Sequence, residues 1–324
     1  MRRVLPFLLA ASCAVLGGAA AQPAPQAPDP ASPQWTEADI ETIQATTKPG
    51  PAVWRVSKGD SEVWILGTVG PLPKNFSWNK DYVADLLDGA KAVITPPGVG
   101  IGIGDAAWLL ISYGNRLSLP RGQALETTMD APMRARFVAL RTSLGKDEER
   151  YRTDSPFRAA IRLSTDFRDK MQLTGDDGIF RLARDKKVPV KPAAENTSGY
   201  DVVRDVLTLP TDKQRICLGQ MIDDINYLSS HAETAARAWA IGDIRTLKAN
   251  LDDRPDILDC VATAVGSLGA VRAKAAAAEA AGIEAALNQK GKNIAFINMR
   301  ELLRKGGVLE QLEARHLTIE GPAE

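Results

Sequence analysis

Histidine and cysteine, which often carry metal or nucleophile chemistry, are scarce in this sequence. Its 324 residues include 2 histidines, His231 and His316, and 3 cysteines. Neither histidine stands in a nucleophile motif, so we exclude Ser-His-Asp and Cys-His arrangements and interpret both as surface or helix-end residues. Adjacent acidic pairs such as Asp223-Asp224 are interpreted as helix caps or solvated faces, because neighbours along a helix do not face each other.

Two of the three cysteines, Cys217 and Cys260, lie well inside the chain. Both fall in segments with helical spacing, and an even count in an exported chain permits one disulfide between two helices. Two buried free thiols are the alternative, because a disulfide requires a geometry that the sequence does not reveal.

The N-terminus carries the pattern of a secretory signal peptide over residues 1–21. Met1-Arg2-Arg3 is a positively charged start, an apolar run follows, and Ala19-Ala20-Ala21 provides an A-x-A cleavage site. Residues 22–50 begin rich in alanine, proline and glutamine and are interpreted as a tether and lead-in. We expect export to the periplasm or the extracellular space, with lipidation of Cys13 as a minor alternative.

The overall charge balance excludes a further class of protein. The sequence has 40 Lys and Arg against 40 Asp and Glu, whereas nucleic-acid binding usually needs a basic stripe. A hydrophobic fraction of 44% with 25% charged residues is typical of a globular chain. We therefore expect no nucleic-acid partner, and no transmembrane span once the signal peptide is removed.

The elements that must position any functional side chain are those of an α/β fold. Residues 53–56 and 63–66 flank Gly59-Asp60 and predict a β-hairpin. Further strands are predicted at 92–95, 188–190, 293–298 and 317–320, and helices over 81–90, 301–315 and most of 106–182 and 200–287. Strands separated by helices are typical of α/β proteins. We expect one domain over residues 51–320, with a central sheet built from N- and C-terminal strands and a largely helical middle.

Several of these segments resemble the TraB/GumN family, the wider group that holds the Tiki proteases. The second hairpin strand ends in Gly67-Thr68-Val69-Gly70-Pro71, which is similar to a family strand that ends in G-x-x-H before a proline-containing turn. Similar matches follow in order at 175–182, 188–190 with Glu195, 209–214, the W-x-x-G-D element 239–243, and 294–312. The resemblance implies an α/β fold with two G-x-x-H motifs, whose histidines are proposed to hold a divalent metal for hydrolysis together with acidic residues.

This sequence departs from the family pattern at the positions that would bind the metal. The first histidine position is Gly70, and the second motif reads Asn298-Met299-Arg300-Glu301. We therefore interpret Gly67, Gly70, Asn298 and Glu301 as degenerate motif positions, with Glu195 as the candidate site residue that is retained. A catalytic zinc site generally needs three protein ligands, so the joint absence of both histidines is expected of an active site that no longer binds its metal.

The favoured expectation is an exported TraB/GumN-like protein with a degenerate metal-hydrolase site. It would be non-catalytic, without a cofactor, and would bind a protein, peptide or envelope ligand as an accessory of the cell envelope. The alternative is an active metal-dependent hydrolase or peptidase with a rebuilt carboxylate site, where Glu195 and Glu301 bind a divalent cation or act as an acid–base pair. A third possibility is a purely structural or interaction protein of the envelope.

Two further features invite a binding interpretation. Gly98–Gly104 fits neither phosphate-binding glycine pattern, so it is predicted to be a flexible loop that could act as a lid. Trp54, Trp64, Trp78 and Trp108 are predicted to pack in the core, with an apolar groove for a peptide or glycan as the alternative.

Overall fold

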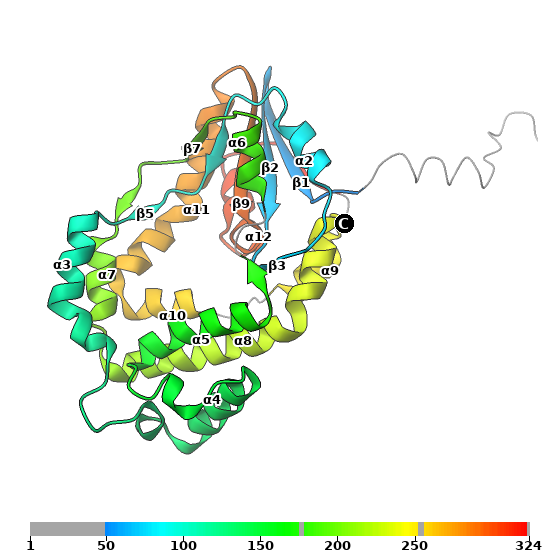
Figure 1. The fold of residues 1–324 in the computed structure, drawn as a ribbon. Coiled ribbons are helices and arrows are strands. Elements are labelled where there is room, and N and C mark those ends of the chain that lie inside the picture. Colours follow the sequence, from blue (N-terminus) through cyan, green and yellow to red (C-terminus); the bar gives the residue numbers. More distant parts are fainter. Residues whose placement is uncertain (1–48, 175–177, 252–255, 323–324) are drawn as a thin grey trace, which may run out of the picture. The chain divides into compact units, whose positions relative to one another are not determined.

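A six-stranded sheet is built around the predicted hairpin (Figure 1). Strands β1 (Val53–Lys58) and β2 (Ser61–Thr68) pair antiparallel, and Gly59 between them adopts a positive φ of 58° that suits glycine. The sheet order is β10-β1-β2-β9-β4-β7, which confirms a mixed α/β fold with a helical middle. The computed structural model describes residues 49–174, 178–251 and 256–322, so the predicted signal peptide, Cys13 and most of the tether lie outside the described residues.

Four strands of this sheet run parallel and end at the same edge. They are β2, β9 (Gly291–Asn298), β4 (Val93–Thr95) and β7 (Val190–Pro192). β9 is central, and its residues 293–297 are all buried, as expected for a strand covered on both faces. Thr68 pairs with Asn298, so the segments that follow β2 and β9 begin side by side.

A long helix connects the sheet to a second, helical core. This helix, α8 (Thr211–Ala240), has 30 residues and is about 45 Å long at 1.5 Å per residue. Its Leu218 and Ile222 pack in a core with α4 (Ala131–Ser143) and α5 (Pro156–Lys170), whereas Trp239 packs in the sheet core. The same helix therefore ties both cores together.

The remaining elements fill the connections between strands. The helices are α2 (Lys80–Leu87), α3 (Ile103–Tyr113), α6 (Ile179–Asp185), α7 (Tyr200–Leu207), α9 (Ile244–Asn250), α10 (Ile257–Ala264), α11 (Gly266–Leu287), α12 (Met299–Leu303) and α13 (Val308–Glu313), with 3-10 turns at Gly114–Leu117, Leu125–Thr128 and Glu148–Arg150. The short strands are β3 (Leu72–Pro73), β5 (Val99–Gly100), β6 (Leu173–Thr174), β8 (Thr197–Ser198) and β10 (Ile319–Glu320). The strands at the two ends of the chain thus enclose a helical middle, as predicted.

The prediction of a disulfide between two helices is confirmed. Cys217 on α8 and Cys260 on α10 are bonded, with their Cα atoms 5.5 Å apart and a sequence separation of 43. The bond fixes the middle of α10 against the N-terminal part of α8.

Three local predictions were wrong in detail. The helix predicted over 301–315 is two helices, because Gly306 has a φ of +70° and a Cβ on Gly307 would lie 2.5 Å from the Glu301 carbonyl oxygen. The segment Gly98–Gly104 is not simply a loop, since it contains β5, which pairs with β8, and the first residues of α3. Trp108 is exposed, whereas Trp54 is buried and Trp64 and Trp78 are half-buried.

Candidate functional site

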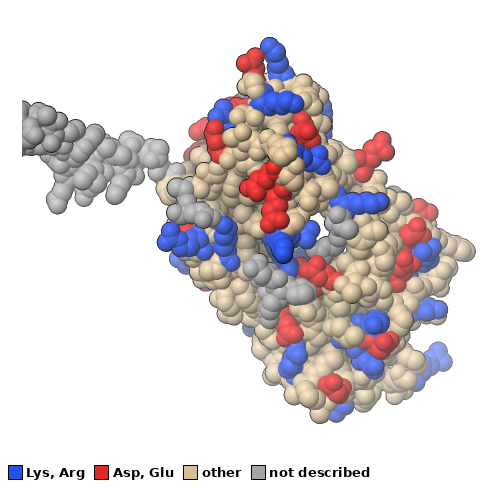
Figure 2. Space-filling view, turned by 180° about the vertical axis from the view of Figure 1, so that it is seen from behind, with Lys and Arg blue, Asp and Glu red and all other residues tan. Residues whose placement is uncertain are grey.

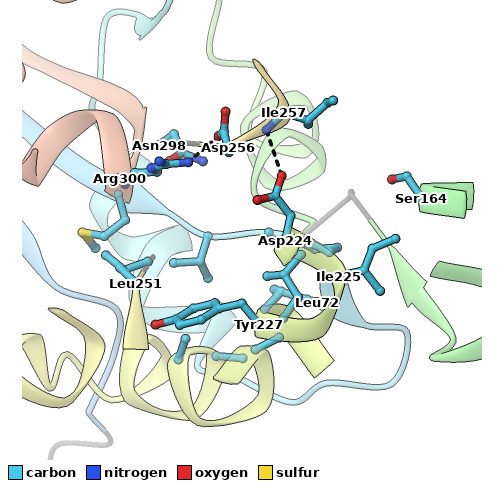
Figure 3. Close-up of a pocket in the computed structure, with 18 of the residues that line it drawn as sticks. Leu72, Ser164, Asp224, Ile225, Tyr227, Leu251, Asp256, Ile257, Asn298 and Arg300 are labelled. Carbon is cyan, nitrogen blue, oxygen red and sulfur yellow. Dashed lines mark hydrogen bonds and ion pairs between the residues drawn. The ribbon is translucent and has the colours of Figure 1, made fainter. Parts of the chain in front are cut away.

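A cavity of about 510 Å³ lies at the carboxyl edge of the sheet. Residues 68–72, at the end of β2 and after it, and residues 298–301, at the end of β9 and after it, form part of its wall. Residues from α5, α8, the end of α9 and the start of α10 form the rest (Figure 3). Because β2 and β9 are parallel neighbours, the two degenerate motifs open onto the same space. This edge is where α/β sheets commonly bind ligands.

The two glycines of the first motif have different surroundings. Gly67 is tightly enclosed, since a Cβ there would lie 2.2 Å from Cε of Met299. Its carbonyl accepts a buried hydrogen bond from Nε1 of Trp239 at 2.8 Å, which ties the end of β2 to α8. Gly70 lines the cavity, and a Cβ there would meet nothing within 4 Å. The histidine position of the family motif is therefore open space with no side chain to fill it.

The polar side chains of the second motif are held by their own neighbours. Oδ1 of Asn298 accepts the backbone N–H of Arg300 at 2.9 Å and caps α12. Oε2 of Glu301 accepts a hydrogen bond from Nε of Arg304 at 2.6 Å. The guanidinium of Arg300 forms an ion pair with Asp256 across the cavity wall (Figure 3). The polar side chains of this segment are therefore engaged by neighbours within the described chain.

Sequence reasoning missed Glu279, a carboxylate on α11 whose charge is coupled to Glu301. Its side chain is buried, and its Oε2 has no hydrogen-bond partner in the described part of the chain. Burial and the negative charge of Glu301 raise the pKa of Glu279 to about 7, although the positive charge of Arg304 opposes the rise. Helical spacing could have revealed it, because Glu279 lies three residues after Ala276 and four before Ile283, which both face the core.

Asp224 also differs from its sequence interpretation as a cap or solvated residue. It is buried in the cavity wall and accepts hydrogen bonds from the Ile257 backbone N–H at 2.8 Å and from Nε2 of Gln220 at 3.0 Å. The adjacent Asp223 does face solvent, where it pairs with Arg136. Asp224 therefore anchors the start of α10 to α8 beside the cavity (Figure 3).

Glu195 is not brought to this cavity. It is exposed in the segment after β7, and β4 lies between β7 and β9 in the sheet. Among the described residues that line the cavity, Gly70 and Glu301 are present and Glu195 is not.

The two histidines also stay away from the motif positions. His231 lies within α8, stacked on Tyr227 with ring centroids 3.9 Å apart, and its Nδ1 lies 2.9 Å from the Tyr227 carbonyl oxygen. His316 follows α13, is exposed and has a φ of 58°. Neither histidine is among the described residues that line the cavity.

The described residues around the cavity do not fit a divalent metal. Gly70 offers no ligand, Glu301 is paired with Arg304, and Arg300 adds a positive charge to the same wall. Within residues 49–174, 178–251 and 256–322, no three His, Cys, Asp or Glu side chains are grouped as a ligand set. A catalytic zinc site generally needs three protein ligands, so this donor set is insufficient.

The model of the TraB/PrgY/gumN family matches residues 52–321, which include both strand-end motifs and the whole cavity. The chain belongs to the TraB/PrgY/gumN family. No curated protein and no solved structure matches it. In this TraB/PrgY/gumN member, none of the described helices has the length and apolar character needed to cross a bilayer. On the face seen in Figure 2, Lys and Arg are interspersed with Asp and Glu, without a continuous basic stripe.

Proposed function

We propose that this protein uses the cavity to bind a ligand and does not catalyse metal-dependent hydrolysis. One observation carries the proposal: the two family motifs converge on the cavity, yet they present Gly70 and an ion-paired Glu301 in place of two histidines. The scaffold and the cavity are kept, while the imidazole ligands are absent from both motif positions. A binding or accessory role accounts for both facts.

The lining suggests the chemistry of the ligand. Most of the wall is apolar, with Leu72, Ile225 and Leu251 among the side chains drawn in Figure 3. Asn298, Arg300 and Asp256 lie together near the end of β9 and form one polar region of the wall. Cavities of this size and composition suit a drug-sized molecule or a few side chains of a peptide. We infer a ligand with an apolar body and a polar group at one end.

Export to the periplasm or the extracellular space is part of the same proposal. The disulfide between Cys217 and Cys260 supports it, because disulfides persist mainly in oxidising compartments. The signal-peptide pattern of residues 1–21 supports it independently. The protein would then act on an envelope ligand or partner.

Metal content and hydrolysis test the non-catalytic assignment. The exported protein, purified after signal cleavage, should contain less than one equivalent of zinc, manganese or cobalt by mass spectrometry of the dissolved metal. It should not cleave a mixed peptide library above the buffer control. Stoichiometric, tightly bound metal together with hydrolysis that a chelator abolishes would show an active metal enzyme instead.

Filling the cavity tests the binding role. Anilinonaphthalene sulfonate, an apolar ring system with one charged group, is a suitable probe. Ala232→Phe places a ring in the cavity, whereas Thr234→Phe adds the same ring at an exposed position of the same helix. The probe should bind wild type and Thr234→Phe alike and Ala232→Phe several-fold more weakly. Equal binding by all three would contradict a ligand site in this cavity.

The alternative, an active hydrolase that uses Glu195 and Glu301 as a pair, has less support. An acid–base pair must act on one substrate, and Glu195 is not among the described residues that line the cavity with Glu301. If the metal and peptide assays did reveal activity, Glu195→Gln would show whether this carboxylate contributes. Loss of that activity would restore the alternative.

A further inference from the structure

Helix α3 turns apolar side chains toward solvent. Ile103 is 91% exposed and Ile111 is 81% exposed, and Trp108 and Leu110 are 59% and 60% exposed. The preceding segment adds Val99 and Ile101, which are also exposed. We name these six residues the α3 patch. Large side chains of this kind are usually buried, so a cluster on one helix marks an interaction surface.

The arrangement around the helix is the reverse of an ordinary surface helix. At 3.6 residues per turn, Leu110, Ile103, Ala107, Ile111 and Trp108 cover a continuous arc of about 160°. Leu109, the buried residue of the helix, lies on the opposite side. A surface helix normally points its apolar stripe at the core and its charges at water. Here the arc that faces outward has no charged residue.

The α3 patch is held in place by the fold. α3 packs on α7, and β5, which leads into α3, pairs with β8, which leads into α7. Figure 1 shows α3 at the margin of the described chain, with α7 on its inner side. The outward face is therefore presented by an ordered helix, supported from behind.

We propose that the α3 patch inserts into the interfacial region of a lipid bilayer. A helix of 11 residues is about 16 Å long, so its single face falls well short of the roughly 800 Å² per partner that stable protein–protein interfaces bury. An interfacial helix, by contrast, needs only a modest apolar face that lies in the membrane plane. Tryptophan favours this interface because its ring is apolar and its N–H is polar.

The charges around the helix agree with a bilayer as the partner. Asp105 is the one charged residue in α3, and it lies beside the packed side, outside the apolar arc. Arg116 and Arg121 follow the helix in sequence and are exposed, so they are accessible to anionic headgroups. The predicted export supplies a reason for contact with a membrane, but the inference rests on the patch itself.

Vesicle binding tests this inference with the full exported chain. The protein is sedimented with large vesicles of phosphatidylcholine and phosphatidylglycerol. Wild type should bind, and Ile103→Ser with Ile111→Ser should weaken binding by about tenfold or more, because each side chain loses its transfer into an apolar environment. Ile241→Ser is the matched control, since Ile241 is also exposed but lies beyond the far end of α8. This control should bind like wild type.

Two further measurements decide between the possible partners. Brominated acyl chains should quench the tryptophan fluorescence of wild type more strongly than that of Trp108→Phe. This difference would place the Trp108 ring in the bilayer. Sedimentation equilibrium without lipid should give a monomer for wild type. The inference is overturned if wild type does not bind the vesicles, or if the Ser variant binds equally well. A dimer that the Ser variant converts to a monomer would overturn it in favour of a second copy of the chain.

Discussion

Replacing Glu279 with glutamine should remove a fall in stability between pH 5 and pH 8. The buried carboxyl has its pKa raised from 4.5 to about 7, first by burial and then by the charge of Glu301. Between these pH values the native state keeps the proton that the unfolded chain releases. The contribution to stability is therefore full below pH 4.5 and is lost as the pH rises through 7.

The size of the effect follows from the shift in pKa. A pKa raised from 4.5 to about 7, at about 1.4 kcal/mol for each tenfold change in proton affinity, lowers the free energy of unfolding by about 3 kcal/mol at pH 8 relative to pH 4.5. Glu279 is only 4% exposed, so solvent screens little of this energy. Glutamine has nearly the same shape and no charge. Glu279→Gln should therefore be more stable than wild type at pH 8, and the difference should shrink toward pH 5.

Urea unfolding followed by tryptophan fluorescence at pH 5, 6, 7 and 8 measures the effect. Glu284→Gln is the control on the same helix, because Glu284 is partly exposed and pairs with Arg315 at 2.7 Å. The free energy of unfolding of Glu284→Gln should fall between pH 5 and pH 8 as that of wild type does. The reasoning is refuted if the Glu279→Gln and wild-type free energies of unfolding run parallel across this pH range.

Three other perturbations follow from the described contacts. Asp166→Asn should destabilise the protein by about 1–3 kcal/mol at pH 7, because it breaks a bidentate ion pair, at 2.7 and 2.8 Å, between the buried Asp166 and the partly exposed Arg150. Burial alone would raise the pKa of Asp166, but the hydrogen bonds from Arg150 and Tyr151 lower it to about 2. Wild type should therefore lose the stability that this ion pair contributes as the pH falls from about 4 toward 2, which circular dichroism can follow. Reducing the disulfide between α8 and α10 should lower the free energy of unfolding by about 2–4 kcal/mol in urea titrations with and without reductant. Gly67→Ala should reduce the free energy of unfolding by about 1–3 kcal/mol through overpacking, whereas Gly70→Ala should leave it nearly unchanged. Equal changes in the melting temperature of the two variants would contradict the different surroundings of the two glycines.

Local patterns in the sequence predicted much of the fold. Alternating residues around Gly59-Asp60 predicted β1 and β2, since a strand with one buried face has a period of two. The pair Gly306-Gly307 is a local signal for the break between α12 and α13, but the helical spacing on both sides of it led to the prediction of one helix. Such errors concern the ends of elements and not their order.

Burial of single polar or aromatic residues was harder to predict. Glu279 and Asp224 look like ordinary helix-surface residues, and their burial depends on which neighbouring elements cover them. Trp108 was expected in the core for its size, but α3 packs on α7 in a way that leaves this side chain outside. Side-chain type sets a preference for burial, while the packing partner decides it.

The sequence by itself determined the family layout and the absence of histidine at positions 70 and 301, because these depend on which residues occur and in what order. It also supplied the two cysteines, although only the fold brings their Cα atoms to 5.5 Å. Tertiary structure alone decided which motif residues share a cavity. The parallel pairing of β2 with β9 brings Gly70 and Glu301 to one wall, whereas the position of β7 at the sheet edge leaves Glu195 outside it. The pairing of β2 with β9 joins residues more than 200 positions apart, which no local pattern encodes.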